Sequence, residues 1–222
     1  MRMLMIGTLF AVAAGMAQAQ TSEIAATVTD EQGSPIADAV VVAVPADAGA
    51  RASAKAGEHS RAGVVDQVDK EFTPKVTVIL VGTAVTFPNH DAVRHQVYSF
   101  SPAKRFELPL YAGVPAKPVV FDKPGVVVLG CNIHDWMVGY IYVSESPYFA
   151  KTGKDGKASI AELLPRAYVV RVWHPELEAA EDTTRRNVDA SRPGRADVAW
   201  TLKLKREVKV RRAPGSEGRG RY

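Results

Sequence analysis

Short β-like runs separated by turn residues make up the chain after its first twenty residues, and we find no convincing amphipathic helix there. Runs of about four to eight residues bounded by Gly, Pro, Asn and Asp are typical of strands. The pattern therefore predicts an all-β fold, with residues 106–118 as a loop. The expected strands cover residues 23–30, 39–44, 76–80, 84–87, 95–100, 119–121, 126–129, 138–143, 158–160, 168–172 and 197–204.

The N-terminus has the features of a secretory signal. Arg2 precedes an apolar stretch over residues 3–14, and Ala17-Gln18-Ala19 has the small-x-small form of a signal-peptidase site. We expect cleavage after Ala19 and a periplasmic or secreted protein. No later apolar run has the length of a membrane span.

The basic charge of the chain is concentrated at its C-terminus. Residues 203–222 hold eight Lys or Arg and two Glu, a net charge of +6, whereas the whole chain carries +4. The tail could steer the protein towards an acidic partner, or it could simply be a solvated end. Nucleic acid is not expected as a partner, because the chain is predicted to be exported and has no recognisable nucleic-acid-binding motif.

One segment carries most of the candidate chemistry, and its sequence is Cys131-Asn132-Ile133-His134-Asp135-Trp136-Met137. It lies between two β-like runs and is predicted to be the loop that joins them. A thiolate, an imidazole and a thioether on one short loop suit copper, which in blue-copper sites has two His, one Cys and a distant Met. A single buried Cys more commonly acts as a small apolar residue, so the copper interpretation depends on the whole set.

The loop lacks a second His, and four others are available: His59, His90, His95 and His174. We favour His95 because it begins a predicted strand, whose rigid backbone could direct the ring to the loop. His90 is the alternative ligand.

Three neighbouring side chains could support the metal ligands. Asp91 and Asp135 flank His residues and could hydrogen-bond to them, although simple surface exposure is the more common role. Trp136 could shield the metal from water.

Residues 64–143 resemble a cupredoxin of the plastocyanin and azurin type. Val85-Thr86-Phe87-Pro88-Asn89 with Asp91 and His95 resembles the pattern around the first His ligand. Pro124-Gly125, Cys131, His134, Met137 and Gly139 resemble the pattern around the other ligands. The resemblance implies one type 1 copper ion held by His95, Cys131, His134 and Met137. Only two residues separate His134 from Met137, fewer than is usual in plastocyanin-like loops.

The flanking segments resemble two parts of a carboxypeptidase-regulatory-like, or transthyretin-like, β-sandwich. Val28-Thr29-Asp30 with Gly33 and Pro35 resembles its opening hairpin, and Asp155-Gly156 with residues 168–172 resembles its later strands. Proteins with this pairing are often labelled methylamine utilisation proteins. The two resemblances together imply a cupredoxin Greek-key sandwich inserted into a second, smaller prealbumin-like sandwich. The expected organisation is a signal peptide (1–19), the first part of the smaller sandwich (20–50), a linker (51–63), the copper domain (64–147), the second part of the smaller sandwich (148–206) and a basic flexible tail (207–222).

The favoured function is electron transfer between the copper ion and a redox protein. The alternatives are a periplasmic copper carrier or sensor, which would release the metal, and a non-metal module that binds carbohydrate or protein. Enzyme activity is the least favoured, because a Cys–His hydrolase needs a base placed for catalysis. His134, three residues from Cys131 on a short loop, suits shared metal ligation better.

Overall fold

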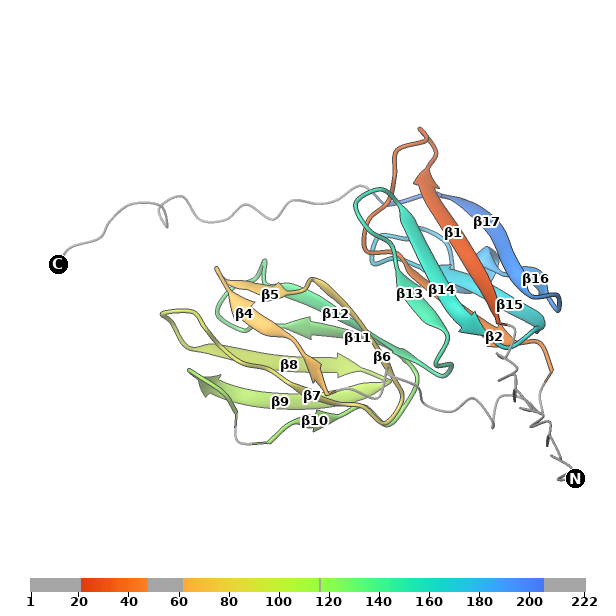
Figure 1. Ribbon diagram of the computed structural model, residues 1–222. Helices are drawn as coiled ribbons and strands as arrows, with labels where there is room; N and C mark the ends of the chain where they lie inside the picture. Colours follow the sequence, from red (N-terminus) through yellow and green to blue (C-terminus); the bar gives the residue numbers. More distant parts are fainter. Residues whose placement is uncertain (1–20, 48–61, 116, 206–222) are drawn as a thin grey trace, which may run out of the picture.

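The structure is a computed structural model that describes residues 21–47, 62–115 and 117–205 (Figure 1). The predicted signal peptide, His59 and most of the basic tail lie outside these residues. The predicted all-β fold is confirmed. In the described part of the chain, strands alternate with turns, and one 3-10 helix, η3 (Glu181–Thr184), interrupts them. No helix among these residues has the length and apolar character needed to cross a membrane.

The first β-sandwich is made of strands from both ends of the described chain. One of its sheets has the order β14-β1-β17 and the other has the order β13-β2-β15-β16. Ile24, Ala26 and Val28 alternate along β1 and point into the core between the sheets. The strands are β1 (Ser22–Asp30), β2 (Val40–Pro45), β13 (Phe149–Lys151), β14 (Lys157–Leu163), β15 (Arg166–Trp173), β16 (Arg186–Ala190) and β17 (Gly194–Leu202).

The second β-sandwich is made of the strands between β2 and β13. A five-stranded sheet with the order β6-β12-β11-β8-β9 and a three-stranded sheet with the order β10-β7-β3 enclose its core, and β4 and β5 form a separate hairpin. Its core contains Phe87, Phe121 and Leu129. The strands are β3 (Gly63–Val64), β4 (Asp66–Val68), β5 (Glu71–Thr73), β6 (Val76–Leu80), β7 (Ala84–Thr86), β8 (His95–Ser101), β9 (Lys104–Tyr111), β10 (Val119–Val120), β11 (Gly125–Gly130) and β12 (Val138–Ser144).

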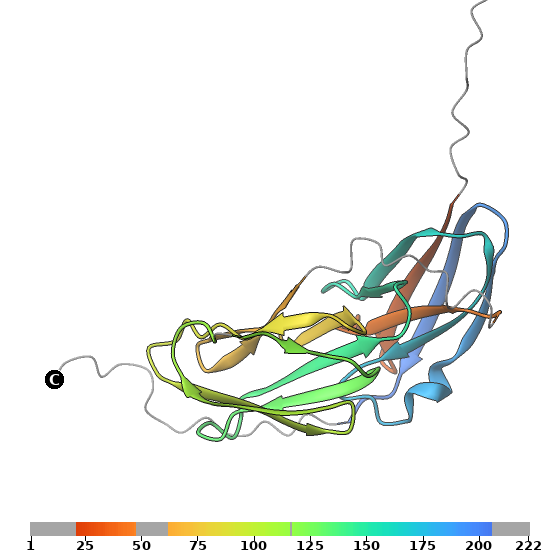
Figure 2. The same cartoon turned by 90° about the horizontal axis from the view of Figure 1, so that it is seen from below.

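The two sandwiches lie side by side and share an apolar interface (Figures 1 and 2). Val40, Val42 and Val44 on one face of β2 pack against Val76 of β6 and Tyr142 of β12. The opposite face of β2 faces the core of the first sandwich, and all six residues of the strand are therefore buried. A strand that is covered on both faces has a continuous apolar run rather than an alternating one.

Polar contacts reinforce this interface. The Tyr142 hydroxyl donates to Glu181 at 2.6 Å, and Lys151 donates to the Val76 carbonyl at 2.9 Å. Where β12 leads into β13, the Ser146 hydroxyl donates to the Ala43 carbonyl at 2.6 Å. The second sandwich is thus held to the first through buried side chains as well as through the chain itself.

The prediction of a loop over residues 106–118 is wrong for its first six residues, which belong to β9. Phe106 and Leu108 pack against the core, while Arg105 and Glu107 are exposed. Pro109 obscured this alternation in the sequence, but β9 is an edge strand, where a missing N–H costs no ladder bond. The sequence also gave no sign of β13, β16 or the β4–β5 hairpin, and β3 begins at Gly63, the last residue of the predicted linker.

Candidate metal centre

The segment from Cys131 to Met137 is the loop between β11 and β12, as predicted. Its ends are fixed because Gly130 and Val138 are paired in the sheet. Inside the loop, the Met137 N–H donates to the His134 carbonyl at 2.9 Å. Cys131 and Met137 are buried in the core of the second sandwich, whereas His134 is partly exposed. The loop therefore places one sulfur–imidazole pair at the boundary between core and solvent.

His95 meets this loop from the neighbouring strand. It is the first residue of β8, its side chain is fully buried, and a register irregularity in the pairing of β8 with β9 lies beside it. Such irregularities redirect side chains and are common next to functional sites. Its Nδ1 lies 3.7 Å from the Cys131 Sγ, and the Nδ1 of His134 lies 4.0 Å from the same sulfur.

These three side chains fit a metal ion. One ligand atom from each of His95, Cys131 and His134 lies within 4.8 Å of the other two. Metal–nitrogen bonds of about 2.0 Å and metal–sulfur bonds of about 2.3 Å at trigonal or tetrahedral angles separate the two donors by roughly 3.5–3.7 Å. The observed sulfur–nitrogen distances of 3.7 and 4.0 Å are close to that separation.

Asp91 lies behind His95, on the side away from the sulfur. Its Oδ2 is 2.6 Å from the His95 Nε2, and its carboxylate also accepts hydrogen bonds from the backbone N–H groups of Asp69 at 2.7 Å and Lys70 at 2.9 Å. Burial raises the pKa of Asp91, but the hydrogen bonds from Lys70, His95 and Asp69 outweigh it, and the pKa is lowered. The carboxylate is therefore ionised at neutral pH.

Asn89 holds the segment that carries Asp91 and His95. Its side-chain amide donates to the carbonyls of Val93 at 3.0 Å and Tyr111 at 2.9 Å, and its Oδ1 accepts the Asp91 N–H at 3.0 Å. Asn89 is itself buried. A buried amide with several partners fixes the turn before β8.

His134 lies between His95 and Trp136. The ring centroids are 4.9 Å apart for His95 and His134, and 5.1 Å apart for His134 and Trp136. Desolvation, with His95 and Lys70 nearby, lowers the pKa of His134. A lowered pKa keeps the imidazole neutral near pH 7, which is the form that binds metals.

The other His candidates lie elsewhere. His90 is exposed and its Nδ1 pairs with Asp66 at 2.7 Å, and it is not part of the cluster. The Nδ1 of His174, in the first sandwich, accepts the Glu176 N–H at 3.2 Å. Asp135 is exposed on the loop.

Sequence reasoning missed the β4–β5 turn and the role of Asn89. Asp69 and Lys70 both have left-handed backbone conformations, with φ of 54° and 60°. Two such residues between paired strands form the tight hairpin turn that leaves the backbone N–H groups free to bind Asp91. The only sequence signal was the polar pair itself, between Val68 and Glu71.

Comparison with known proteins gives structural matches over part of the chain. No protein-family model matches the sequence, and no curated protein matches it. A Cu-containing nitrite reductase from Thermus scotoductus SA-01 is 32% identical over 38% of this chain and 22% of its own, with a TM-score of 0.35. A purple cupredoxin from Nitrosopumilus maritimus is 28% identical over 37% of this chain and 99% of its own, with a TM-score of 0.33. A Cu(I) structure of an amicyanin mutant is 24% identical over 37% of this chain and 82% of its own, with a TM-score of 0.34.

Proposed function

We propose that this chain is a copper protein that exchanges single electrons with a protein partner. The observation that carries the proposal is the cluster of His95, Cys131 and His134, whose ligand atoms lie within 4.8 Å of one another. Two imidazoles and one thiolate are the donor set of blue-copper electron-transfer sites. A bound type 1 copper ion would supply a one-electron Cu(II)/Cu(I) couple.

Each ligand would have its own part in this function. His95 and Cys131 are buried, exclude water and hold their donor atoms in place before metal arrives. Met137 would supply a weaker fourth donor, because it is buried in the same core cluster as Cys131 and lies on the same loop. The burial of these side chains favours a metal that is retained over one that is passed on.

His134 is the ligand through which a partner would exchange electrons, because it is the one that is partly exposed. Exposed apolar residues lie on the segments next to the candidate ligands, and Ile133, which precedes His134 in the chain, is 48% exposed. Val93 is 41% exposed and Val114 is 65% exposed, next to the bridge between Asn89 and Gly113. We infer that these exposed apolar residues contribute to a docking surface for the partner, since apolar patches on a protein surface mark interaction sites.

The visible spectrum after addition of Cu(II) to the protein tests this function. We expect an intense charge-transfer colour from the wild-type protein, its loss in Cys131→Ser, and the loss of tight copper binding in His134→Ala. His174→Ala is the matched control, because that His lies in the first sandwich, and it should bind copper like the wild type. Equal loss of copper in His134→Ala and His174→Ala would refute the site.

We also propose the domain organisation and export predicted from the sequence, with residues 64–147 inserted between residues 20–50 and 148–206. The pairing of β1 with both β14 and β17 supports a first sandwich made from two separate segments. Export after cleavage at Ala19 would place the copper site in the periplasm or outside the cell, and N-terminal sequencing of the secreted protein tests it.

A further inference from the structure

The hydrogen bond between Asp91 and His95 fixes which ring nitrogen faces the sulfur. The Asp91 Oδ2 lies 2.6 Å from Nε2, the His95 side chain is completely buried, and that of Asp91 is 12% exposed. An ionised carboxylate can only accept a hydrogen bond, so the ring proton must be on Nε2. In the neutral ring, the lone pair of Nδ1 is then directed at the space shared with Cys131, 3.7 Å away.

The carboxylate cannot easily turn away from this bond. The N–H groups of Asp69 and Lys70 hold its two oxygens at 2.7 and 2.9 Å, and the Asp91 N–H is bound to Asn89 at 3.0 Å. Hydrogen bonds from the β4–β5 turn and to Asn89, in the segment before β8, therefore fix Asp91 from two sides. Asp91 thus connects a hairpin 21–22 residues earlier in the chain to the buried imidazole.

We infer that Asp91 is a positioning residue that sets the tautomer of His95 and lowers the reduction potential of the copper site. This inference rests on the proposed function. A carboxylate bound to the outer nitrogen of a metal-binding His fixes the ring and makes its other nitrogen a stronger donor. The negative charge, shielded from solvent, also favours the more highly charged oxidised ion.

Asp66 and His90 provide a matched control. They form a second Asp–His pair in the same sandwich, with 2.7 Å between the Asp66 Oδ2 and the His90 Nδ1. The His90 side chain is 65% exposed, and His90 is outside the donor cluster. Neutralising Asp66 therefore removes the same unit of charge from a similar pair that does not support a ligand.

The first experiment uses the metal-free protein and does not depend on copper. Nitrogen-15 NMR of the His rings above about pH 8, where imidazoles are ordinarily neutral, should show His95 as a single tautomer protonated at Nε2. In Asp91→Ala the ring should become a mixture or change to the Nδ1-protonated form. An unchanged His95 tautomer in folded Asp91→Ala would overturn the inference.

The second experiment measures the reduction potential after loading with copper. Asp91→Asn preserves the size of the side chain but removes its charge, and we expect the potential to rise, while Asp66→Asn leaves it near the wild-type value. Equal shifts in both variants, or none in Asp91→Asn, would refute the role of Asp91 at the metal. If the wild type bound no copper, the proposed function would fail. The NMR experiment would still decide whether Asp91 sets the tautomer of His95.

Discussion

Replacing Gly139 with Ala is expected to destabilise the second sandwich, because its new methyl group has no room. Gly139 lies in β12 and is paired with Leu129. A Cβ at this position would be 2.8 Å from the Cβ of Phe72 and 3.1 Å from two of its ring carbons. The Cβ of Phe72 moves only with the backbone of β5, and Phe72 is 2% exposed within the core. The methyl group can therefore be accommodated only if β5 shifts.

Gly130 is the matched control on the neighbouring strand. A Cβ at Gly130 would lie 2.7 Å from the Cζ of Tyr98, which is a shorter contact than the 2.8 Å found at Gly139. That atom is at the far end of a partly exposed side chain, whose ring lies at a tilt against Phe100, itself 74% exposed. The Tyr98 ring can rotate towards solvent. We therefore expect Gly130→Ala to lose less stability than Gly139→Ala, although its contact distance is shorter.

The expected magnitudes separate the two variants clearly. Overpacking a well-packed core costs about 1–3 kcal/mol, whereas Gly to Ala within a strand relieves about 0.5–1 kcal/mol of conformational entropy. Gly139→Ala should lose roughly 1–2 kcal/mol, and Gly130→Ala should stay within about 0.5 kcal/mol of the wild type. At about 2–4 °C per kcal/mol, thermal unfolding of the metal-free protein resolves them. Equal destabilisation by both changes would refute the argument that the mobility of the contacted atom decides the cost.

Two further predictions concern Met137 and His174. Met137→Leu should keep the visible colour of the copper-loaded protein and raise its reduction potential, because a weak sulfur donor is lost. An unchanged potential would show that Met137 only packs beneath the loop. Desolvation lowers the pKa of His174 in the folded protein, so the unfolded state binds a proton first and stability falls as the pH drops below about 6.5. His174→Gln should reduce this loss of stability at low pH, which is measured as the difference in the free energy of unfolding of the metal-free protein between pH 7.5 and 5.5. An identical pH dependence in the wild type and the variant would contradict the prediction.

The strands were largely predictable because their signals are local. The run of residues 39–44 predicts a strand by composition alone, and β2 is found there. The burial of both faces of β2, in contrast, could not be predicted from its own sequence. The residues that cover its second face, Val76 and Tyr142, come from β6 and β12 and reach it only through tertiary packing.

The candidate site, too, was partly predictable from local sequence and partly determined by long-range contacts. Cys131 and His134 are three residues apart on one loop, so their proximity follows from the sequence. The start of a predicted strand favours His95 over His90, but the contacts that distinguish the two are long-range: Asp66 of β4 pairs with His90, while His95 is buried at the start of β8. The support that Asp69 and Lys70 give to Asp91 depends on backbone conformation, and the pattern of apolar residues carries no information about it.

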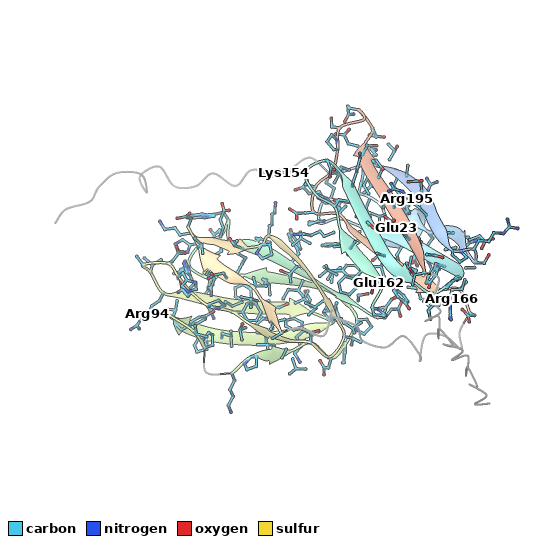
Figure 3. All side chains as sticks on the ribbon, in the orientation of Figure 1. Glu23, Arg94, Lys154, Glu162, Arg166 and Arg195 are labelled. Atoms are coloured by element: carbon cyan, nitrogen blue, oxygen red, sulfur yellow. The ribbon has the colours of Figure 1, made fainter. Side chains whose placement is uncertain are left out.

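The candidate metal loop directly precedes β12, and the first sandwich packs beside the same strand without burying His134. β12 begins at Val138, directly after the candidate metal loop, and ends at Ser144, beside the junction with the first sandwich. Seven residues of extended strand span roughly 20 Å. Figure 3 shows Arg94, the residue before His95, at the end of the second sandwich that lies away from Glu162 and Arg166 of the first. The interface with the first sandwich includes Tyr140 and Tyr142 of β12, whose rings both lie near that of Trp173, but none of the three candidate ligands. His134 therefore stays partly exposed beside this interface.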